Sequence, residues 1–118
     1  MPVYMTQFAY TPEAWAALAK RPEDRSKVLS GLLEQFGGKL ICFYYAFGDY
    51  DGVFIFEAPD ETAAASALLG AIGAGHNRAF KTTPLLTVEQ AMGALTKGRG
   101  VHYRPPTESA DTWRPYTD

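Results

Sequence analysis

The 118-residue sequence predicts an α+β fold in which a four-stranded antiparallel sheet carries two main helices on one face. Segments rich in β-branched and aromatic residues alternate with segments of helical periodicity, in the order strand, helix, strand, strand, helix, strand. A turn rich in glycine and aspartate separates the two central strands, which is typical of an antiparallel hairpin. The composition, 47% hydrophobic and 20% charged, fits one globular domain.

The first half of the chain is expected to form a strand and a broken helix. Residues 3–9 have strand composition, and the following Thr11-Pro12 pair suits a helix start because threonine caps and proline has no N–H to leave unpaired. Pro22 predicts a break in the helix. Beyond the break, apolar residues recur at helical spacing as far as Phe36, and Gly37-Gly38 ends the helix.

The second half is expected to contain the hairpin, a helix and a last strand. Residues 40–47 are an uncharged run of strand-forming residues, and residues 53–57 form the partner strand. An alanine-rich helix capped by Asp60 follows, and then a weaker strand over residues 77–86. This order of elements is the split βαβ, or ferredoxin-like, arrangement.

The C-terminal part differs in composition from the rest. Thr87-Val88-Glu89-Gln90 matches a capping box and predicts an extra helix, and the prolines after it indicate an irregular tail. We therefore expect one domain over residues 1–97 and a Pro-rich tail over residues 98–118. The tail contains three aromatic residues: Tyr103, Trp113 and Tyr116. These residues either dock on a folded domain, in the same dimer or a neighbouring one, or do not dock, in which case the tail has no order.

Charge, cysteine content and hydropathy exclude several classes of function. Eleven basic and 13 acidic residues give a net charge of -2, which offers no electrostatic footprint for nucleic acid or an anionic membrane. The single Cys42 excludes an intramolecular disulfide and is expected to be a buried small hydrophobe. No signal-peptide pattern precedes the longest apolar run, residues 40–47, which is too short to cross a bilayer, so we expect a cytoplasmic protein.

The first hairpin strand predicts self-association. Its residues are apolar or aromatic on both faces, with Ile41, Phe43, Tyr45 and Phe47 on one side and Leu40, Cys42, Tyr44 and Ala46 on the other. A sheet face exposed to water would be polar instead. We therefore expect a homodimer, or a higher oligomer, with two sheets packed face to face.

The hairpin and its flanks resemble the GYD domain family, which is named for a Gly-x-Tyr-Asp hairpin. The signals that carry the resemblance are Gly37-Gly38-Lys39-Leu40, Phe43-Tyr44-Tyr45, Gly48-Asp49-Tyr50-Asp51 and Glu57-Ala58-Pro59-Asp60. The resemblance covers residues 2–97 and implies a dimeric α/β barrel with a ferredoxin-like protomer and a central cavity between paired sheets. The sequence departs from the family pattern at Gly52, where a β-branched residue is usual, and in its Pro-rich tail.

The resemblance brings no established reaction, because a fold does not determine a function. Relatives in the wider superfamily include cofactor-independent monooxygenases, haem-degrading enzymes, isomerases and stress-related proteins. Three functions therefore remain open. The chain binds a small apolar or aromatic metabolite between sheet and helices, or it is a cofactor-independent monooxygenase or isomerase, or it is a structural or interaction module without a ligand.

The candidate catalytic residues are His76, Tyr44 and Tyr50. His76 stands just before the fourth strand, where an imidazole at the sheet rim is suited to acid-base work near neutral pH; the alternative is a solvent-facing loop histidine. Tyr50 lies in the turn over residues 48–51, either at a cavity mouth or simply as part of the turn. Tyr44 would orient a substrate through its hydroxyl.

The candidate ligand-binding residues are four aromatic rings and two strand cations. The rings form either core and dimer interface or a pocket for a flat apolar molecule: Tyr4, Phe43, Tyr45 and Phe54. Arg78 and Lys81 have odd spacing on the fourth strand, so only one is expected to face a cavity and bind an anionic group such as a carboxylate. A strand-edge charge that blocks unwanted pairing is the alternative. No metal-ligand spacing or nucleotide-binding motif is present in the sequence, and neither a metal nor a cofactor is expected.

Overall fold

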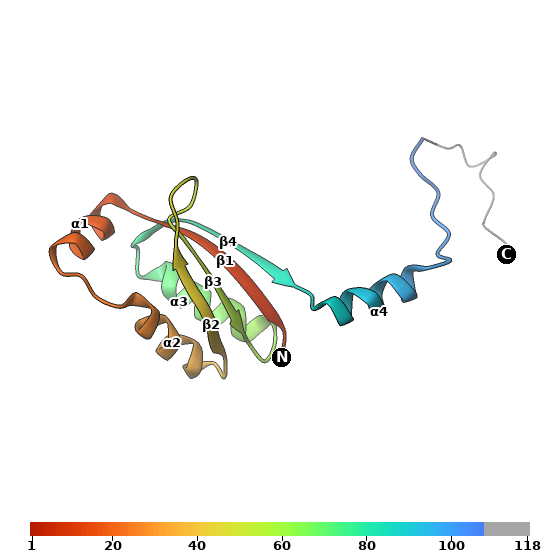
Figure 1. Cartoon of the computed structure of the whole chain (residues 1–118), viewed down its shortest axis with the longest axis horizontal. Helices are drawn as coiled ribbons and strands as arrows, with labels where there is room; N and C mark the ends of the chain where they lie inside the picture. Colours follow the sequence, from red (N-terminus) through yellow and green to blue (C-terminus); the bar gives the residue numbers. More distant parts are fainter. Residues whose placement is uncertain (108–118) are drawn as a thin grey trace. The chain divides into compact units, whose positions relative to one another are not determined.

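The computed structural model, which describes residues 1–107, confirms the ferredoxin-like α+β fold (Figure 1). The four strands form one antiparallel sheet in the order β2-β3-β1-β4. The elements are β1 (Val3–Tyr10), α1 (Pro12–Lys20), α2 (Arg25–Gln35), β2 (Lys39–Tyr45), β3 (Gly52–Glu57), α3 (Glu61–Gly73), β4 (Asn77–Leu85) and α4 (Val88–Gly98). No helix in the described part of the chain is long and apolar enough to cross a membrane.

The chain divides into two compact units between Leu85 and Leu86. The first unit holds the sheet with α1, α2 and α3, and the second begins just before α4. The domain boundary expected after residue 97 stays a prediction. Trp113 and Tyr116, for which docking was considered, lie outside the described residues.

The helices begin where capping chemistry predicts. Thr11 Oγ1 accepts a hydrogen bond from the Ala14 amide at 3.2 Å at the start of α1, and Asp60 Oδ1 accepts one from the Ala63 amide at 2.8 Å at the start of α3. The expected capping box opens α4. Pro22 lies in the gap between α1 and α2, so the predicted helix break is confirmed.

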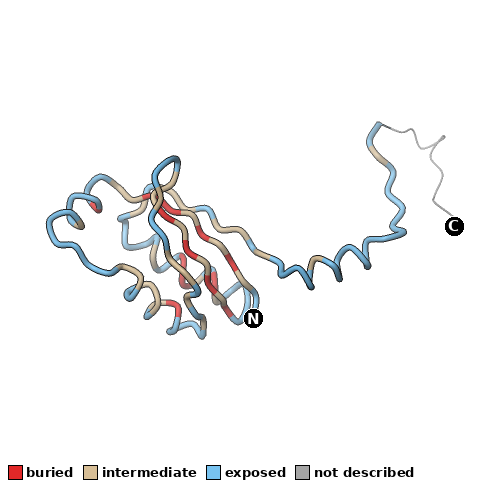
Figure 2. Tube along the Cα trace, in the orientation of Figure 1, coloured by how far each residue is buried: buried red, intermediate tan, exposed pale blue. Residues whose placement is uncertain are grey.

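The core forms where α2 and α3 pack on one face of the sheet (Figure 2). Strand residues of this helix face are buried together with Leu33 of α2 and three residues of α3: Tyr4, Phe8, Phe54, Phe56, Ala64, Ala67 and Leu68. Thr6 is fully buried on the same face, and its hydroxyl shares a 2.8 Å hydrogen bond with the Thr82 hydroxyl. This bond satisfies a polar group that would otherwise destabilise the core.

A β-bulge in β2 corrects the predicted alternation of side chains. Leu40 pairs with Phe56 and Cys42 pairs with Ile55, so the register shifts at Ile41. Leu40 was expected on the same side as Cys42, and this expectation is wrong. The extra residue moves every preceding side chain to the opposite face, so Leu40 packs against the core with Phe43.

The opposite face, here called the open sheet face, is not covered by a helix of the described first unit. Its apolar side chains are partly exposed: Val3, Met5, Cys42, Val53, Ile55 and Leu85. Tyr44, which is 65% exposed, lies among them. Cys42, expected to be buried, is only partly buried because it lies on this face.

Gly52 is required by the packing of Phe8 rather than by turn geometry. The two residues face each other across β1 and β3, and the Phe8 ring occupies the space above the glycine. A Cβ at position 52 would lie 2.6 Å from Cε1 and 3.0 Å from Cε2 of Phe8. Phe8 is buried among other rings and cannot swing away. The departure from the family pattern therefore has a steric cause.

Gly52→Ala should lower the free energy of unfolding by about 1–3 kcal/mol, because the new methyl group overlaps a ring that is held on all sides. Gly31→Ala is the matched control, because a Cβ in that helical position meets open space and should stabilise α2 by about 0.5–1 kcal/mol. Urea unfolding measures both changes. In a Phe8→Leu background the penalty of Gly52→Ala should shrink, and an unchanged penalty there would contradict the steric explanation.

Candidate functional site

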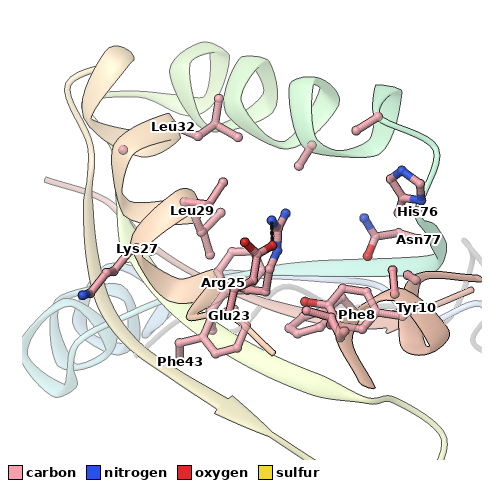
Figure 3. Close-up of a pocket in the computed structure, with 18 of the residues that line it drawn as sticks. Phe8, Tyr10, Glu23, Arg25, Lys27, Leu29, Leu32, Phe43, His76 and Asn77 are labelled. Atoms are coloured by element: carbon pink, nitrogen blue, oxygen red, sulfur yellow. Dashed lines mark hydrogen bonds and ion pairs between the residues drawn. The ribbon is translucent and has the colours of Figure 1, made fainter. Parts of the chain in front are cut away.

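A cavity of about 1020 Å³ opens between the helix face of the sheet and the helices α1, α2 and α3 (Figure 3). Each strand contributes one phenylalanine to its lining: Phe8 from β1, Phe43 from β2, Phe54 from β3 and Phe80 from β4. The rings of Phe43 and Phe54 stack with centroids 6.0 Å apart and planes 5° apart, and Phe8 lies 5.4 Å from Phe43. We call these four residues the phenylalanine floor. The volume of the cavity, together with the phenylalanine side chains in its lining, is typical of a small-molecule pocket.

Asp51, the last residue of the Gly-Asp-Tyr-Asp turn, accepts hydrogen bonds from two residues near the edge of this cavity. Its Oδ2 accepts one hydrogen bond from the Tyr10 amide at 2.9 Å and another from Trp15 Nε1 at 3.1 Å. The rings of Tyr10 and Trp15 meet edge to face, 5.2 Å apart. Asp51 therefore ties the hairpin turn to the end of β1 and to α1, which is a positioning role.

The charged groups of the cavity come from the break between α1 and α2. Arg21, Glu23, Arg25 and Lys27 are among the lining residues, and the Lys27 ammonium points away from the cavity (Figure 3). Arg25 Nη1 donates to Glu23 Oε1 at 2.8 Å, and this contact raises the pKa of Arg25 and keeps it charged. The local charge is positive, although the chain as a whole has a net charge of -2.

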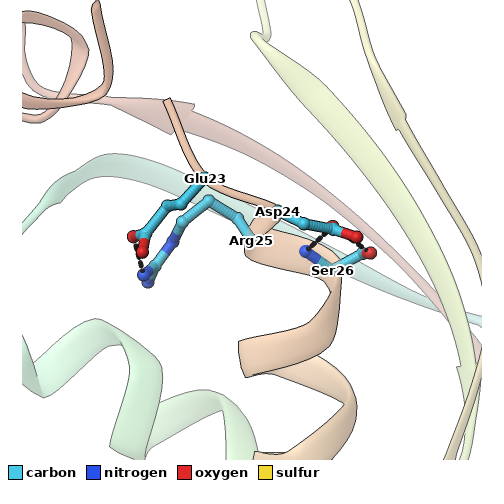
Figure 4. A network of polar contacts seen from close by, with 4 residues as sticks. All are labelled: Glu23, Asp24, Arg25 and Ser26. Carbon is cyan, nitrogen blue, oxygen red and sulfur yellow. Dashed lines mark hydrogen bonds and ion pairs between the residues drawn. The ribbon is translucent and has the colours of Figure 1, made fainter. Parts of the chain in front are cut away.

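The cap of α2 fixes the place of Arg25 (Figure 4). Asp24 Oδ1 accepts from the Ser26 amide at 3.0 Å and also from the Ser26 hydroxyl, and these bonds lower the pKa of Asp24. Arg25 is consequently the first residue of α2, and Lys27 follows in the first turn, which contains no acidic residue. A helix N-terminus favours anions and disfavours cations. This local conflict is of the kind that functional sites tolerate.

Three further polar residues lie at the start of β4 and the end of β1. His76 and Asn77 line the cavity beside Tyr10, and the His76 carbonyl accepts from the Thr11 amide at 3.1 Å. Asn77 Oδ1 is buried, and no residue of the described chain donates a hydrogen bond to it. Burial and the neighbouring Tyr45 raise the pKa of Tyr10, so its hydroxyl stays protonated, with Tyr45 and Arg25 as its polar neighbours.

The structure brings some of the sequence-predicted residues to the cavity and leaves others away from it. Phe43, Phe54 and His76 line it. Tyr4 is buried in the core, stacked on Phe56 at 5.4 Å, and Tyr45 packs edge to face on Phe43 without lining the cavity.

The two tyrosines considered for catalysis do not join His76. Tyr44 projects from the open sheet face, opposite Phe43, and Tyr50 lies in the hairpin turn outside the lining. The proposed acid-base group of His76 with Tyr44 or Tyr50 is therefore not assembled at this cavity within the described chain.

Neither of the strand cations lines the cavity. A bulge between Ala9 and Tyr10 leaves Arg78 without a pairing partner in the β1 register, and Lys81 pairs with Gln7 on the open sheet face. The cationic wall comes from Arg25 and its neighbours instead. Sequence reasoning missed Arg25, Tyr10, Asn77 and Phe80; the one available signal was the basic start of α2, where acidic residues are the rule.

Comparison with known proteins identifies relatives of this chain. A family model described as the GYD domain matches residues 4–95. A protein of Thermus thermophilus, named glutamine synthetase and cystathionine beta-lyase binding protein, is 32% identical over 69 residues, which cover 58% of this chain and 73% of that protein.

Two solved structures align with this chain. The crystal structure of MtbAldR aligns with a TM-score of 0.53 at 14% identity, over 73% of this chain and 53% of MtbAldR, so the chain spans about half the length of that protein. An uncharacterized NIPSNAP domain protein from Burkholderia xenovorans aligns with a TM-score of 0.44 at 14% identity, over 75% of this chain and 95% of that one. The likeness to MtbAldR concerns the fold alone.

Proposed function

The chain belongs to the GYD domain family, and from that premise we propose that it is a small-molecule-binding protein whose cavity takes a flat apolar or aromatic compound. The observation that carries the proposal is the phenylalanine floor, to which all four strands contribute one ring each beneath a cavity of about 1020 Å³. Aromatic faces bind flat apolar groups through buried area and stacking. The polar residues at the wall would orient the bound molecule.

Partly filling the cavity should weaken binding of a neutral aromatic probe, N-phenyl-1-naphthylamine. Gly31 lines the cavity, and a Cβ built on it meets nothing within 4 Å, so Gly31→Phe starts a side chain in open space at the cavity wall. We expect saturable binding by the unaltered protein and a loss of about tenfold in affinity for Gly31→Phe, because the added ring occupies the probe's apolar contact area. Probe fluorescence measures the affinity.

Gly31→Ala is the control at the same position, since it adds a helix-favouring methyl group but little volume. It should bind the probe as the unaltered protein does. Absence of saturable binding by the unaltered protein, or equal binding by Gly31→Phe, would contradict the proposed cavity function.

We further propose that the protein is a homodimer joined through its open sheet face. The support is the row of partly exposed apolar side chains there, including Met5, Val53 and Ile55, which alternate with buried residues along β1 and β3. A water-facing side of an antiparallel sheet is normally polar. A second copy presents the same surface, as a two-fold symmetric interface requires.

A carboxylate on the open sheet face should dissociate the dimer. Ile55→Glu places a charge at the centre of that face, in register with Met5 and Cys42. Burying it against a second apolar sheet is unfavourable, so we expect a dimer mass for the unaltered protein and a monomer mass for the variant in native mass spectrometry at micromolar concentration. Leu69→Glu, at an exposed position of α3, is the control and should stay dimeric. A monomeric unaltered protein would refute the dimer.

A second candidate function is binding of a metabolic enzyme. The relative from Thermus thermophilus is named for binding glutamine synthetase and cystathionine beta-lyase, and α4 of this chain has an exposed apolar stripe. Val88, Met92 and Leu95 are 79%, 62% and 73% exposed and recur at helical spacing. Such a stripe is suited to a groove on another protein.

Charging the α4 stripe tests this candidate. Glutamine synthetase from the organism that encodes this chain should bind the immobilised protein. Met92→Glu should weaken that binding about tenfold, because a charge replaces an apolar side chain that the complex would bury. Lys97→Glu, on the opposite side of α4, should leave binding unchanged. Binding that is absent, or that is equal in both variants, would exclude the stripe as the interface for this enzyme.

A further inference from the structure

We propose that the cavity selects an anionic ligand, a flat apolar or aromatic carboxylic acid whose carboxylate binds the guanidinium of Arg25. The inference rests on the proposed function and names the ligand class for the same cavity. Its first support is charge. Among the described lining residues, Glu23 is the one anion beside Arg21, Arg25 and Lys27, of which Lys27 directs its ammonium away from the cavity (Figure 3), in a chain of net charge -2. A positive wall on an acidic protein attracts anions to that place.

Arg25 already holds a carboxylate in this structure, that of Glu23, at 2.8 Å. The two residues stand two apart, and their side chains are 39% and 55% exposed. A pair this exposed is weak, because nearby water reduces the attraction between the charges and holding two long side chains in place costs entropy. A ligand carboxylate can therefore take the place of Glu23 and engage two N–H groups of the planar guanidinium together.

The opposite wall supplies the second polar contact (Figure 3). Arg25 reaches into the space below α3 from one side and Asn77 from the other. The buried Asn77 Oδ1 has no hydrogen-bond partner in the described chain, and as an acceptor it would take a donor group on the body of the ligand rather than the carboxylate. The protonated hydroxyl of Tyr10 adjoins Arg25 and Tyr45, so Tyr10 helps to position the guanidinium. The phenylalanine floor takes the flat apolar body of the ligand.

A single negative charge fits this wall better than two. The guanidinium fork matches the planar shape of a carboxylate. Glu23 stands against Arg25 and would repel a phosphate dianion more strongly than a monoanion. Arg21 and Lys27 are exposed, so solvent screens their attraction. We therefore assign the head group as a carboxylate rather than a phosphate.

Three probes of matched shape test the head group: 2-naphthoate, the neutral 2-naphthamide and 2-naphthyl phosphate. Their affinities are measured on the full chain by displacement of N-phenyl-1-naphthylamine. The unaltered protein should bind 2-naphthoate about fivefold to tenfold more tightly than 2-naphthamide, because a charge-assisted hydrogen bond is added at a partly exposed site. The preference should fall as ionic strength rises.

Two neighbouring substitutions should act in opposite directions. Arg25→Gln should remove the preference for 2-naphthoate, and Glu23→Gln should tighten 2-naphthoate about threefold because it removes both a competitor and a repelling charge. Neither substitution should change the affinity for 2-naphthamide. Lys81→Gln removes the same charge as Arg25→Gln but on the open sheet face, and should change nothing. A destabilised variant cannot produce tighter binding, so Glu23→Gln separates recognition from folding.

Each outcome bears on one of the two claims. Equal affinity for 2-naphthoate and 2-naphthamide, tighter binding of 2-naphthyl phosphate, or an unchanged preference in Arg25→Gln would overturn the carboxylate assignment while binding of N-phenyl-1-naphthylamine upholds the cavity. Failure of the protein to bind N-phenyl-1-naphthylamine at all would overturn the proposed function and this inference together. The expected pattern, with opposite signs at positions 23 and 25, supports both.

Discussion

The seating of the Phe8 ring over Gly52 is the contact on which the rest of the first unit depends. Phe8 lies at the centre of the helix face and touches rings from β1, β2 and β3. It can do so because position 52 has no side chain. A β-branched residue there would lift the ring from the sheet and disturb the phenylalanine floor. One missing Cβ thus sets the shape of both the core and the cavity.

The break between α1 and α2 is the second determinant of the site. Pro22 cannot continue a helix without loss of a hydrogen bond, and residues 21–24 join α1 to α2 as irregular backbone. The break places Glu23 and Arg25 at the cavity wall, and the Asp24 cap fixes the new helix start beside them. The break between α1 and α2 and the first turn of α2 therefore supply the charged groups that line the cavity, and no strand in the described residues supplies one.

The sequence was sufficient for the fold but only partly for the site. Helix starts depend on local chemistry, so Thr11, Asp60 and the Thr87 capping box were readable in advance. The face of the sheet to which each side chain points could not be predicted in this way. The bulges at Ile41 and beside Tyr10 shift the alternation of side chains and leave no clear mark in the sequence. Phe43 and Phe54 were found as site residues since ring-rich strands are visible. Arg25 was missed because its place depends on how two helices pack across a break.

The two proposed functions, ligand binding and self-association, fall on opposite faces of the sheet, and the residues of the two faces differ accordingly. The helix face carries the phenylalanine floor and the charged residues of the cavity, which are the groups that the proposed ligand binding requires. The open sheet face carries aliphatic residues and Tyr44, which provide area for contact but little chemistry. A dimer formed through the open face leaves both cavities accessible, because the interface and the cavity lie on opposite sides of the same strands. Self-association and ligand binding can therefore occur together in this fold without competing for a surface.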